Sequence, residues 1–186
     1  MKRIFMAILL ISIMCIMGCG NSNTKDSASE SKIDEILINQ KIVFLYHYSN
    51  YSDTIQERGF YIDAKGNKVE YDISEIVSEN RQQVKGFSDI YKIILEFAEG
   101  NQDAGEERLS AEEVSKGYKL LMEMGDDYNI EEKVTANDAG EKSWYGIIDD
   151  GENEPKFILL SGEGDYERIN THKNAQKILK ILAKAE

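Results

Sequence analysis

Apolar and polar residues alternate along the chain with two different periods, one typical of strands and the other of helices. Residues 42–48 are β-branched and aromatic with little interruption, which predicts a strand buried on both faces. Residues 59–63 and 68–72 have the same character and flank a short Gly-Asn segment at 64–67. Because Gly and Asn tolerate positive φ, this pattern predicts a β-hairpin.

Four segments place apolar residues three and four apart, as helices that pack by one face do. The clearest starts at Ser110, which caps the helix while Glu113 returns the hydrogen bond, and Gly125 ends it. Asp72 and Glu75 suggest a second capping box. The predicted apolar faces are Ile73, Ile76 and Val77, then Ile90, Ile94 and Phe97, then Val114, Tyr118 and Leu121, and finally Ala175, Ile178, Leu179 and Leu182.

A second pair of strands is predicted at 143–149 and 156–161, joined by a turn-rich segment and followed by a polar loop at 162–165. The last helix then starts near Asn170 or Thr171. Strands at both ends, with helices between and after them, predict the α+β class with a mostly antiparallel sheet and an amphipathic C-terminal helix. We expect a single domain over residues 32–186.

The N-terminal segment has the features of an export signal. Lys2 and Arg3 precede an apolar run over residues 4–18, which is shorter than the roughly 20 residues that a bilayer-spanning helix needs. The run ends in Ile16-Met17-Gly18-Cys19, which resembles the lipobox of bacterial lipoproteins. An uncleaved anchor and an ordinary secretory signal are the alternatives.

The lipobox resemblance implies that diacylglycerol is attached to Cys19, that residues 1–18 are removed, and that the protein sits on the outer side of a cell membrane. Residues 20–31 contain no large apolar side chain and are expected to form a flexible tether of about 20 Å. The leader, the tether and the later hairpin together resemble small lipoproteins of Gram-positive anaerobes. That resemblance implies no particular activity.

The amino-acid composition excludes thiol chemistry and argues against a nucleic-acid partner. Cys15 lies in the leader and Cys19 takes the lipid, so the mature domain has no thiol for catalysis, metal binding or a disulfide. The net charge is −12, and it falls to about −14 when Lys2 and Arg3 leave with the leader. A chain this acidic is repelled by phosphate backbones, so we expect no nucleic-acid partner.

No segment carries a recognised catalytic or cofactor signature, so we expect neither catalytic residues nor a cofactor. His47 and His172 are the only histidines, and their spacing fits no metal motif. The acidic loop at 149–154 could bind calcium, but it lacks the EF-hand pattern and also reads as a solvated turn. Glu163 and Asp165 could act as a glycosidase pair beside Trp144, Tyr145 and Tyr166.

Tyrosine is the most suggestive feature of the composition. Five of the ten tyrosines fall in the first predicted strand and hairpin: Tyr46, Tyr48, Tyr51, Tyr61 and Tyr71. Tyrosine is enriched on binding faces but is also an ordinary sheet residue. The sequence therefore favours a membrane-anchored domain that binds a protein, peptide or glycan, with a carboxylate-dependent envelope hydrolase as the alternative.

Overall fold

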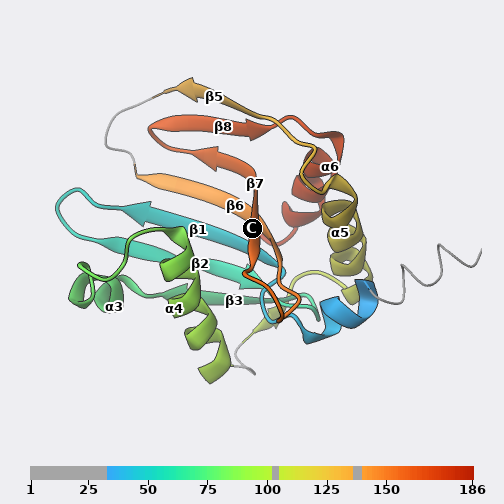
Figure 1. Ribbon diagram of the computed structural model, residues 1–186, viewed down its shortest axis with the longest axis horizontal. Coiled ribbons are helices and arrows are strands. Elements are labelled where there is room, and N and C mark those ends of the chain that lie inside the picture. Colours follow the sequence, from blue (N-terminus) through green and yellow to red (C-terminus); the bar gives the residue numbers. More distant parts are fainter. Residues whose placement is uncertain (1–32, 102–104, 136–139) are drawn as a thin grey trace, which may run out of the picture. The chain divides into compact units, whose positions relative to one another are not determined.

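A computed structural model describes residues 33–101, 105–135 and 140–186 (Figure 1). Cys19, the leader and the tether lie outside these residues. Residues 34–186 form one compact unit. Its helices and antiparallel sheet confirm the predicted α+β class.

In the described residues, eight strands form one sheet in which every pairing is antiparallel. The central strands are those that the sequence predicts, whereas the strands at both edges are short or highly charged. In spatial order the sheet contains β4 (Glu106–Glu107), β3 (Asn67–Asp72), β2 (Gln56–Ile62), β1 (Phe44–Asn50), β6 (Glu141–Ile148), β7 (Lys156–Glu163), β8 (Tyr166–Asn170) and β5 (Ile130–Val134).

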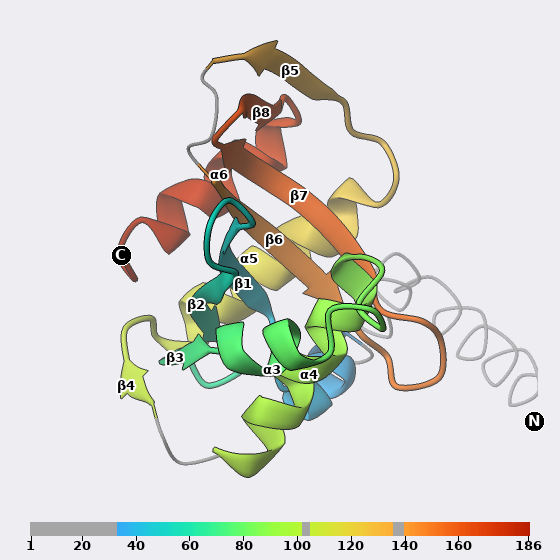
Figure 2. The ribbon, with the colours of Figure 1, turned by 90° about the vertical axis from the view of Figure 1, so that its left-hand side faces the viewer.

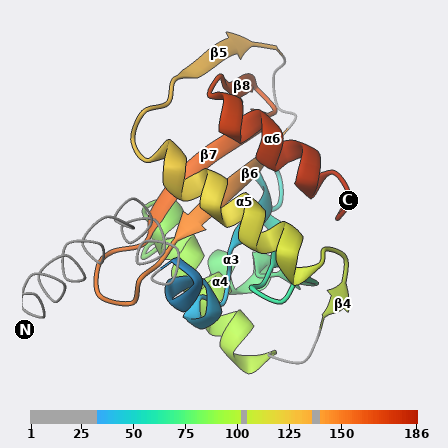
Figure 3. The same ribbon diagram turned by 90° about the vertical axis from the view of Figure 1, so that its right-hand side faces the viewer.

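Helices cover both faces of this sheet. On one face lie α3 (Ser74–Glu79) and α4 (Phe87–Gly100), which are turned toward the viewer in Figure 2. On the other lie α5 (Ala111–Met124) and α6 (Lys173–Leu182), seen in front of β6 and β7 in Figure 3. A further helix covers residues 33–39. We call the two sides the α4 face and the α5 face.

Alternation along the strands sends neighbouring residues to opposite faces. Leu45 belongs to the core cluster that contains Ile90 and Ile94 of α4, so it points to the α4 face. Phe44 points the other way, since a Cβ on Gly117 of α5 would lie only 2.9 Å from its ring. Each face therefore has its own apolar core.

Several local predictions are confirmed. The hairpin forms between β2 and β3, and Gly66 in its turn has a φ of 93°. At the start of α5, Ser110 Oγ accepts a hydrogen bond from Glu113 N while the Glu113 carboxylate accepts one from Ser110 N. Gly125 ends this helix with a φ of 56°.

The capping box predicted for Asp72 and Glu75 is wrong. The residue before α3 is Ile73, which has no side-chain cap, and Asp72 instead accepts two hydrogen bonds from Ser74, from N at 3.0 Å and Oγ at 2.6 Å. Ile76 is 44% exposed because this short helix turns only one edge to the core. Asp72 remains in β3, whose pairing with β2 outweighs the local helix signal.

The C-terminal boundaries also differ from the prediction. The polar loop is reduced to a tight turn, because β7 continues to Glu163 and β8 starts at Tyr166. The final helix begins at Lys173, with His172 as its N-cap, while Asn170 is the last residue of β8. Polar side chains hid β8, because much of this strand lies near the surface.

Candidate functional site

On the α5 face, strand register aligns four charged residues, from four strands, with Tyr48 of β1. Tyr48 pairs with Arg58 of β2 on one side and with Lys142 of β6 on the other. Asp72 pairs with Arg58, and Glu163 pairs with Lys142. We call these five residues the charged row. Its two cations flank the tyrosine, and an acid stands at each end.

Two residues further along each strand, on the same face, lies a second row. We call it the aromatic row, and it contains Glu70, Phe60, Tyr46, Trp144 and Ser161. The rings of Tyr46 and Phe60 stack with centroids 5.0 Å apart, and Trp144 meets Phe60 edge-on at 5.3 Å. Such aromatic contacts fix the ring positions beyond what burial alone does.

The two rows line a groove made of two adjoining hollows. One hollow has a volume of about 780 Å³, lies over β1, β2 and β3 and is also lined by Phe97 of α4. The other, of about 490 Å³, lies over β6 and β7. Both are lined by Tyr46, Phe60 and Lys142, so they adjoin at these three side chains. With strands ~4.8 Å apart, a groove across five strands is about 19 Å long.

The groove contains charges of both signs close to aromatic rings. The Arg58 guanidinium lies 5.3 Å from the centre of the Tyr48 ring, and Lys68 Nζ lies 4.1 Å from that of Phe60. Burial, followed by the charges of Glu186 and Glu163, raises the pKa of Tyr46. The Tyr46 hydroxyl therefore stays protonated and can donate a hydrogen bond to a ligand.

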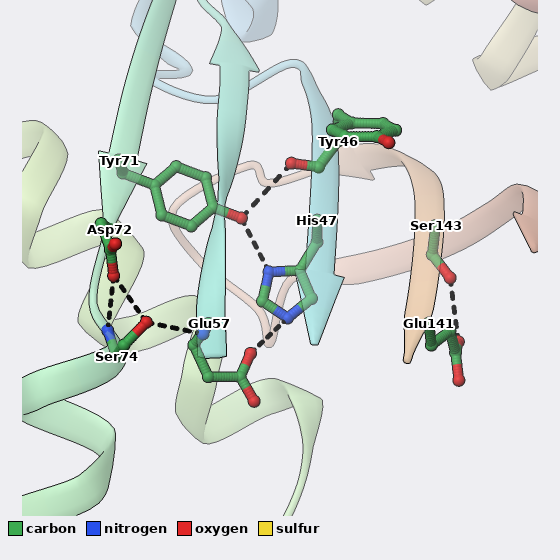
Figure 4. A network of polar contacts seen from close by, with 8 residues as sticks. All are labelled: Tyr46, His47, Glu57, Tyr71, Asp72, Ser74, Glu141 and Ser143. Carbon is green, nitrogen blue, oxygen red and sulfur yellow. Dashed lines mark hydrogen bonds and ion pairs between the residues drawn. The ribbon is translucent and has the colours of Figure 1, made fainter. Parts of the chain in front are cut away.

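The α4 face carries a buried polar cluster beneath the same strands (Figure 4). His47 Nδ1 lies 2.7 Å from the Tyr71 hydroxyl, and His47 Nε2 lies 2.7 Å from a carboxylate oxygen of Glu57. His47 and Tyr71 are each 4% exposed and Glu57 is fully buried. Gly59 stands between Tyr71 and His47 in the register, and the space it leaves lets the tyrosine reach across.

Burial of this cluster has an energetic consequence. Removing a carboxylate from water costs several kcal/mol, and a close cation offsets part of that cost. His47 is the charge partner available to Glu57, since the two side chains form an ion pair when the imidazole is protonated. Burial, reinforced by the charge of Glu57, raises the pKa of Tyr71 well above its ordinary value.

The structure divides the five tyrosines that the sequence grouped. Tyr46 and Tyr48 line the groove from the α5 face, whereas Tyr61 and Tyr71 belong to the core under α4. Tyr71 also borders the larger hollow beside Gly59. Tyr51 follows β1 and lines a cavity on the α4 face. Side chains alternate between the two faces along a strand, which separates the four tyrosines that lie on strands. Tyr51 lies beyond the end of β1 and does not follow this alternation.

Neither the second histidine nor the acidic loop forms a metal site in the described residues. His172 caps α6, with Nδ1 accepting a hydrogen bond from Asn174 N at 3.1 Å. In the 149–154 turn, the carboxylate of Asp150 accepts hydrogen bonds from Asn153 and Glu152, and these bonds lower its pKa. Within the described ranges, no group of three or more His, Cys, Asp or Glu side chains could hold a metal ion.

The two carboxylates of the hydrolase alternative line different hollows. Glu163 faces the groove with Trp144, whereas Asp165 lines a separate cavity with Tyr166 and Glu141. Glu163 is the last residue of β7, whereas Asp165 is the second residue of the two-residue turn between β7 and β8. The structure therefore does not bring this pair together around one substrate position.

Sequence reasoning missed Arg58, Lys142 and Glu57. No local pattern distinguishes them, because each is one charged residue in a chain that is 30% charged. Their positions follow only from the pairing of β1 with both β2 and β6.

Comparisons with known proteins add no relative. No family model, no curated protein and no solved structure matches this chain. Among the residues that the structure describes, no helix combines the length and the apolar character needed to cross a membrane.

Proposed function

We propose that this chain is a lipid-anchored, extracytoplasmic binding domain whose ligand lies in the groove of the α5 face. The observation that carries the proposal is the register that aligns a charged row beside an aromatic row in an open hollow. Pockets with aromatic walls and a few convergent polar groups are the usual form of binding sites.

A segment of a polymer fits this groove better than a compact small molecule, because the hollows extend over five strands. A peptide that binds by strand addition needs a free strand edge. Over the two rows, β2, β1 and β6 are paired on both sides, so their backbone groups are occupied. Among the described residues, β3 pairs with β4 at Asn67 and Lys68 only, so strand addition would be confined to the end of the groove at β3. Recognition rests on rings and charged side chains, which favours a glycan over a peptide.

The anchor is the second half of the proposal. Thioether-linked lipid on Cys19 would hold the domain within about 20 Å of the membrane through the tether. The support for this half is the lipobox resemblance at residues 16–19 and the short apolar leader. A glycan-binding domain held at that distance would contact polymers of the cell envelope.

Glycan binding can be measured by calorimetry with purified residues 20–186 and two soluble probes, chitotetraose and tetragalacturonate. We expect at least one to bind, and Tyr48→Ser to weaken that binding about fivefold, since aromatic contacts contribute on the order of 1 kcal/mol. Tyr166→Ser is the matched control, because Tyr166 is exposed on β8 and does not line the groove.

Equal loss of affinity in the Tyr48 and Tyr166 variants would place the ligand elsewhere. If neither glycan binds while a random-sequence peptide mixture does, and Tyr48→Ser abolishes that binding, the groove takes a peptide instead. Binding of none of these probes would contradict the proposal.

The anchor is tested separately in cells that express the full chain. We expect a clickable palmitate analogue to label the wild-type protein and Cys19→Ala to lose the label, since Cys19 provides the acceptor thiol in the lipobox. Cys15→Ala is the control and should keep the label. Labelling that persists in the Cys19 variant would refute lipid attachment at this residue.

A further inference from the structure

We infer that the free edge of β5 pairs with β5 of a second copy of this chain, so that the two sheets join into one. β5 is the last strand on one side of the sheet (Figure 1), and among the described residues it pairs only with β8. Its last four side chains, at 131–134, are exposed, and Ile130 is half-buried. The groove is lined by other strands, so this inference is independent of the function proposed above.

Hydrogen bonds at both ends of β5 fix the direction of its backbone groups. Just after the strand, Thr135 N donates to Asp165 O at 3.1 Å. Just before it, Asn129 O accepts from Thr171 N at 3.0 Å. Because hydrogen-bonded pairs alternate along an antiparallel ladder, the odd-numbered residues of β5 turn their N–H and C=O groups toward β8. The even-numbered residues 130, 132 and 134 therefore present theirs to the free edge, where a further strand can bond to them.

The side chains of β5 complement one another when two copies pair antiparallel about Glu132. Glu131 of each copy then lies opposite Lys133 of the other, and Ile130 lies opposite Val134. Val134 is 70% exposed, so this pairing covers an apolar side chain. Opposite charges and apolar residues placed directly across an antiparallel pair stabilise it. Within the described residues, none of the three charged side chains of β5 forms an ion pair, so all are available to a second copy.

Charge also selects this register over its neighbours. Moving the two-fold axis by one residue would place Glu131 or Lys133 opposite its own copy, and like charges directly opposite each other destabilise a sheet. About Glu132, only that residue meets its own copy. Arg168, which also pairs with Glu141, stands opposite Glu132 on β8. The two central carboxylates therefore have an arginine on each outer side.

The other edge of the sheet lacks this complementarity. β4 contains only Glu106 and Glu107, so every symmetric pairing of two β4 strands would place acid against acid. Past its pairing with β4, β3 carries Glu70 and Asp72 as its only charges, so acids would again meet without a cation. Short, charged edges of this kind protect a sheet from association. The second copy is therefore assigned to β5.

Sedimentation velocity of purified residues 20–186 measures self-association from about 10 µM to 1 mM, a range suited to a small, transient interface. We expect the wild type to form dimers as its concentration rises. Lys133→Glu places an acid opposite Glu131 in both cross-strand pairs, so it should raise the dimer dissociation constant about tenfold or more. Lys65→Glu makes the same charge change at an exposed position in the β2–β3 turn and should leave association unchanged.

Mixing two variants tests the register directly. Glu131→Lys and Lys133→Glu should each self-associate weakly, because like charges then meet in both cross-strand pairs. An equimolar mixture of the two should form heterodimers, because each acid again lies opposite a lysine. The double variant Glu131→Lys/Lys133→Glu keeps the net charge of the wild type and should self-associate as the wild type does.

Amide hydrogen exchange locates the contact. With rising concentration, the amides of the even-numbered residues 130, 132 and 134 should become protected, because they bond to the second copy. The amides of the odd-numbered residues already bond to β8, so their protection should change little. The amide spectrum of each variant, recorded on dilute samples, shows whether its fold is kept.

Four outcomes would overturn the inference. The protein stays monomeric at about 1 mM; Lys133→Glu and Lys65→Glu weaken association equally; the double variant fails to restore association; or dimers form while the even-numbered amides of β5 stay unprotected. Protection of those amides by an unrelated extended peptide, in a chain that remains monomeric, would assign the edge to a different partner and overturn it as well.

Discussion

The two faces of the sheet treat charged residues in opposite ways over the same strands. On the α5 face, Arg58 and Lys142 reach solvent around a half-buried tyrosine. On the α4 face, Glu57 is fully buried beside His47. The first arrangement costs little folding free energy and leaves charged groups accessible to a partner. The second is held by tertiary packing and depends on every member of the cluster.

The largest expected effect comes from breaking the buried cluster. Glu57→Ala leaves His47 without its charge partner and opens space in the core, so we expect the free energy of unfolding to fall by about 3–5 kcal/mol. Urea denaturation of residues 20–186 measures this. Glu163→Ala, in the exposed charged row, is the control and should change stability by less than about 0.5 kcal/mol. Similar losses of unfolding free energy in Glu57→Ala and Glu163→Ala would contradict the proposed difference between the two faces.

A smaller effect is expected from filling the space between His47 and Tyr71. A Cβ on Gly59 would lie 2.0 Å from the Tyr46 carbonyl oxygen and 3.0 Å from the Tyr71 hydroxyl. Because backbone must move, Gly59→Ala should cost about 1–3 kcal/mol or more. Gly86→Ala meets nothing within 4 Å and serves as the control. A neutral Gly59→Ala variant would show that this close approach is not required.

The loss of folding stability at alkaline pH should reveal the contribution of a buried tyrosine in each of the two cores. Burial raises the pKa of Tyr61, under α4, and of Tyr118, in α5, to about 12 in each case. Unfolded tyrosine ionises near pH 10, so between about pH 10 and 12 the unfolded chain releases protons that the folded chain keeps. Stability contributed by the neutral phenols is therefore present below pH 10 and lost as the pH rises toward 12.

Thermal unfolding across this pH window measures the loss. We expect Tyr61→Phe and Tyr118→Phe each to flatten the decline, since phenylalanine does not titrate. Tyr166→Phe, at an exposed position, should leave the slope as in the wild type. A slope that neither core variant changes would assign the alkaline loss to other groups.

The smallest effect is expected in the charged row itself. Arg58→Gln and Lys142→Gln should each change the free energy of unfolding by less than about 0.5 kcal/mol, because both side chains are exposed. Chemical denaturation gives the value, and calorimetry with the glycan probe gives affinity on the same samples. Loss of stability as large as in Glu57→Ala would assign these cations a structural role instead.

Prediction from sequence succeeded where the signal lies within one turn or one hairpin. Ser110 and Glu113 meet because they are three residues apart at a helix start, and Gly66 makes its turn because it accepts positive φ. It failed at Asp72, where pairing with Arg58 of β2 holds the residue in a strand. It also missed β5 and β8, whose charged sequences lack an apolar period.

The candidate site was only partly visible in the sequence. Tyrosine enrichment drew attention to the first hairpin, and Tyr46 and Tyr48 do line the groove. Their partners Arg58, Lys142 and Trp144 come from strands that are distant in sequence or carry no motif. The sequence predicts that His47 lies in a buried strand, but its contact with Glu57 depends on strand pairing, and its contact with Tyr71 depends on Gly59 between them in the register.

By itself, the sequence determined the class of fold, the start and end of α5, and the first hairpin. Such features arise from interactions between residues close along the chain. Tertiary structure alone decided which charges are buried and which line the groove. That choice depends on the register of β1 against β2 and β6, and a shift of one residue would exchange the two faces.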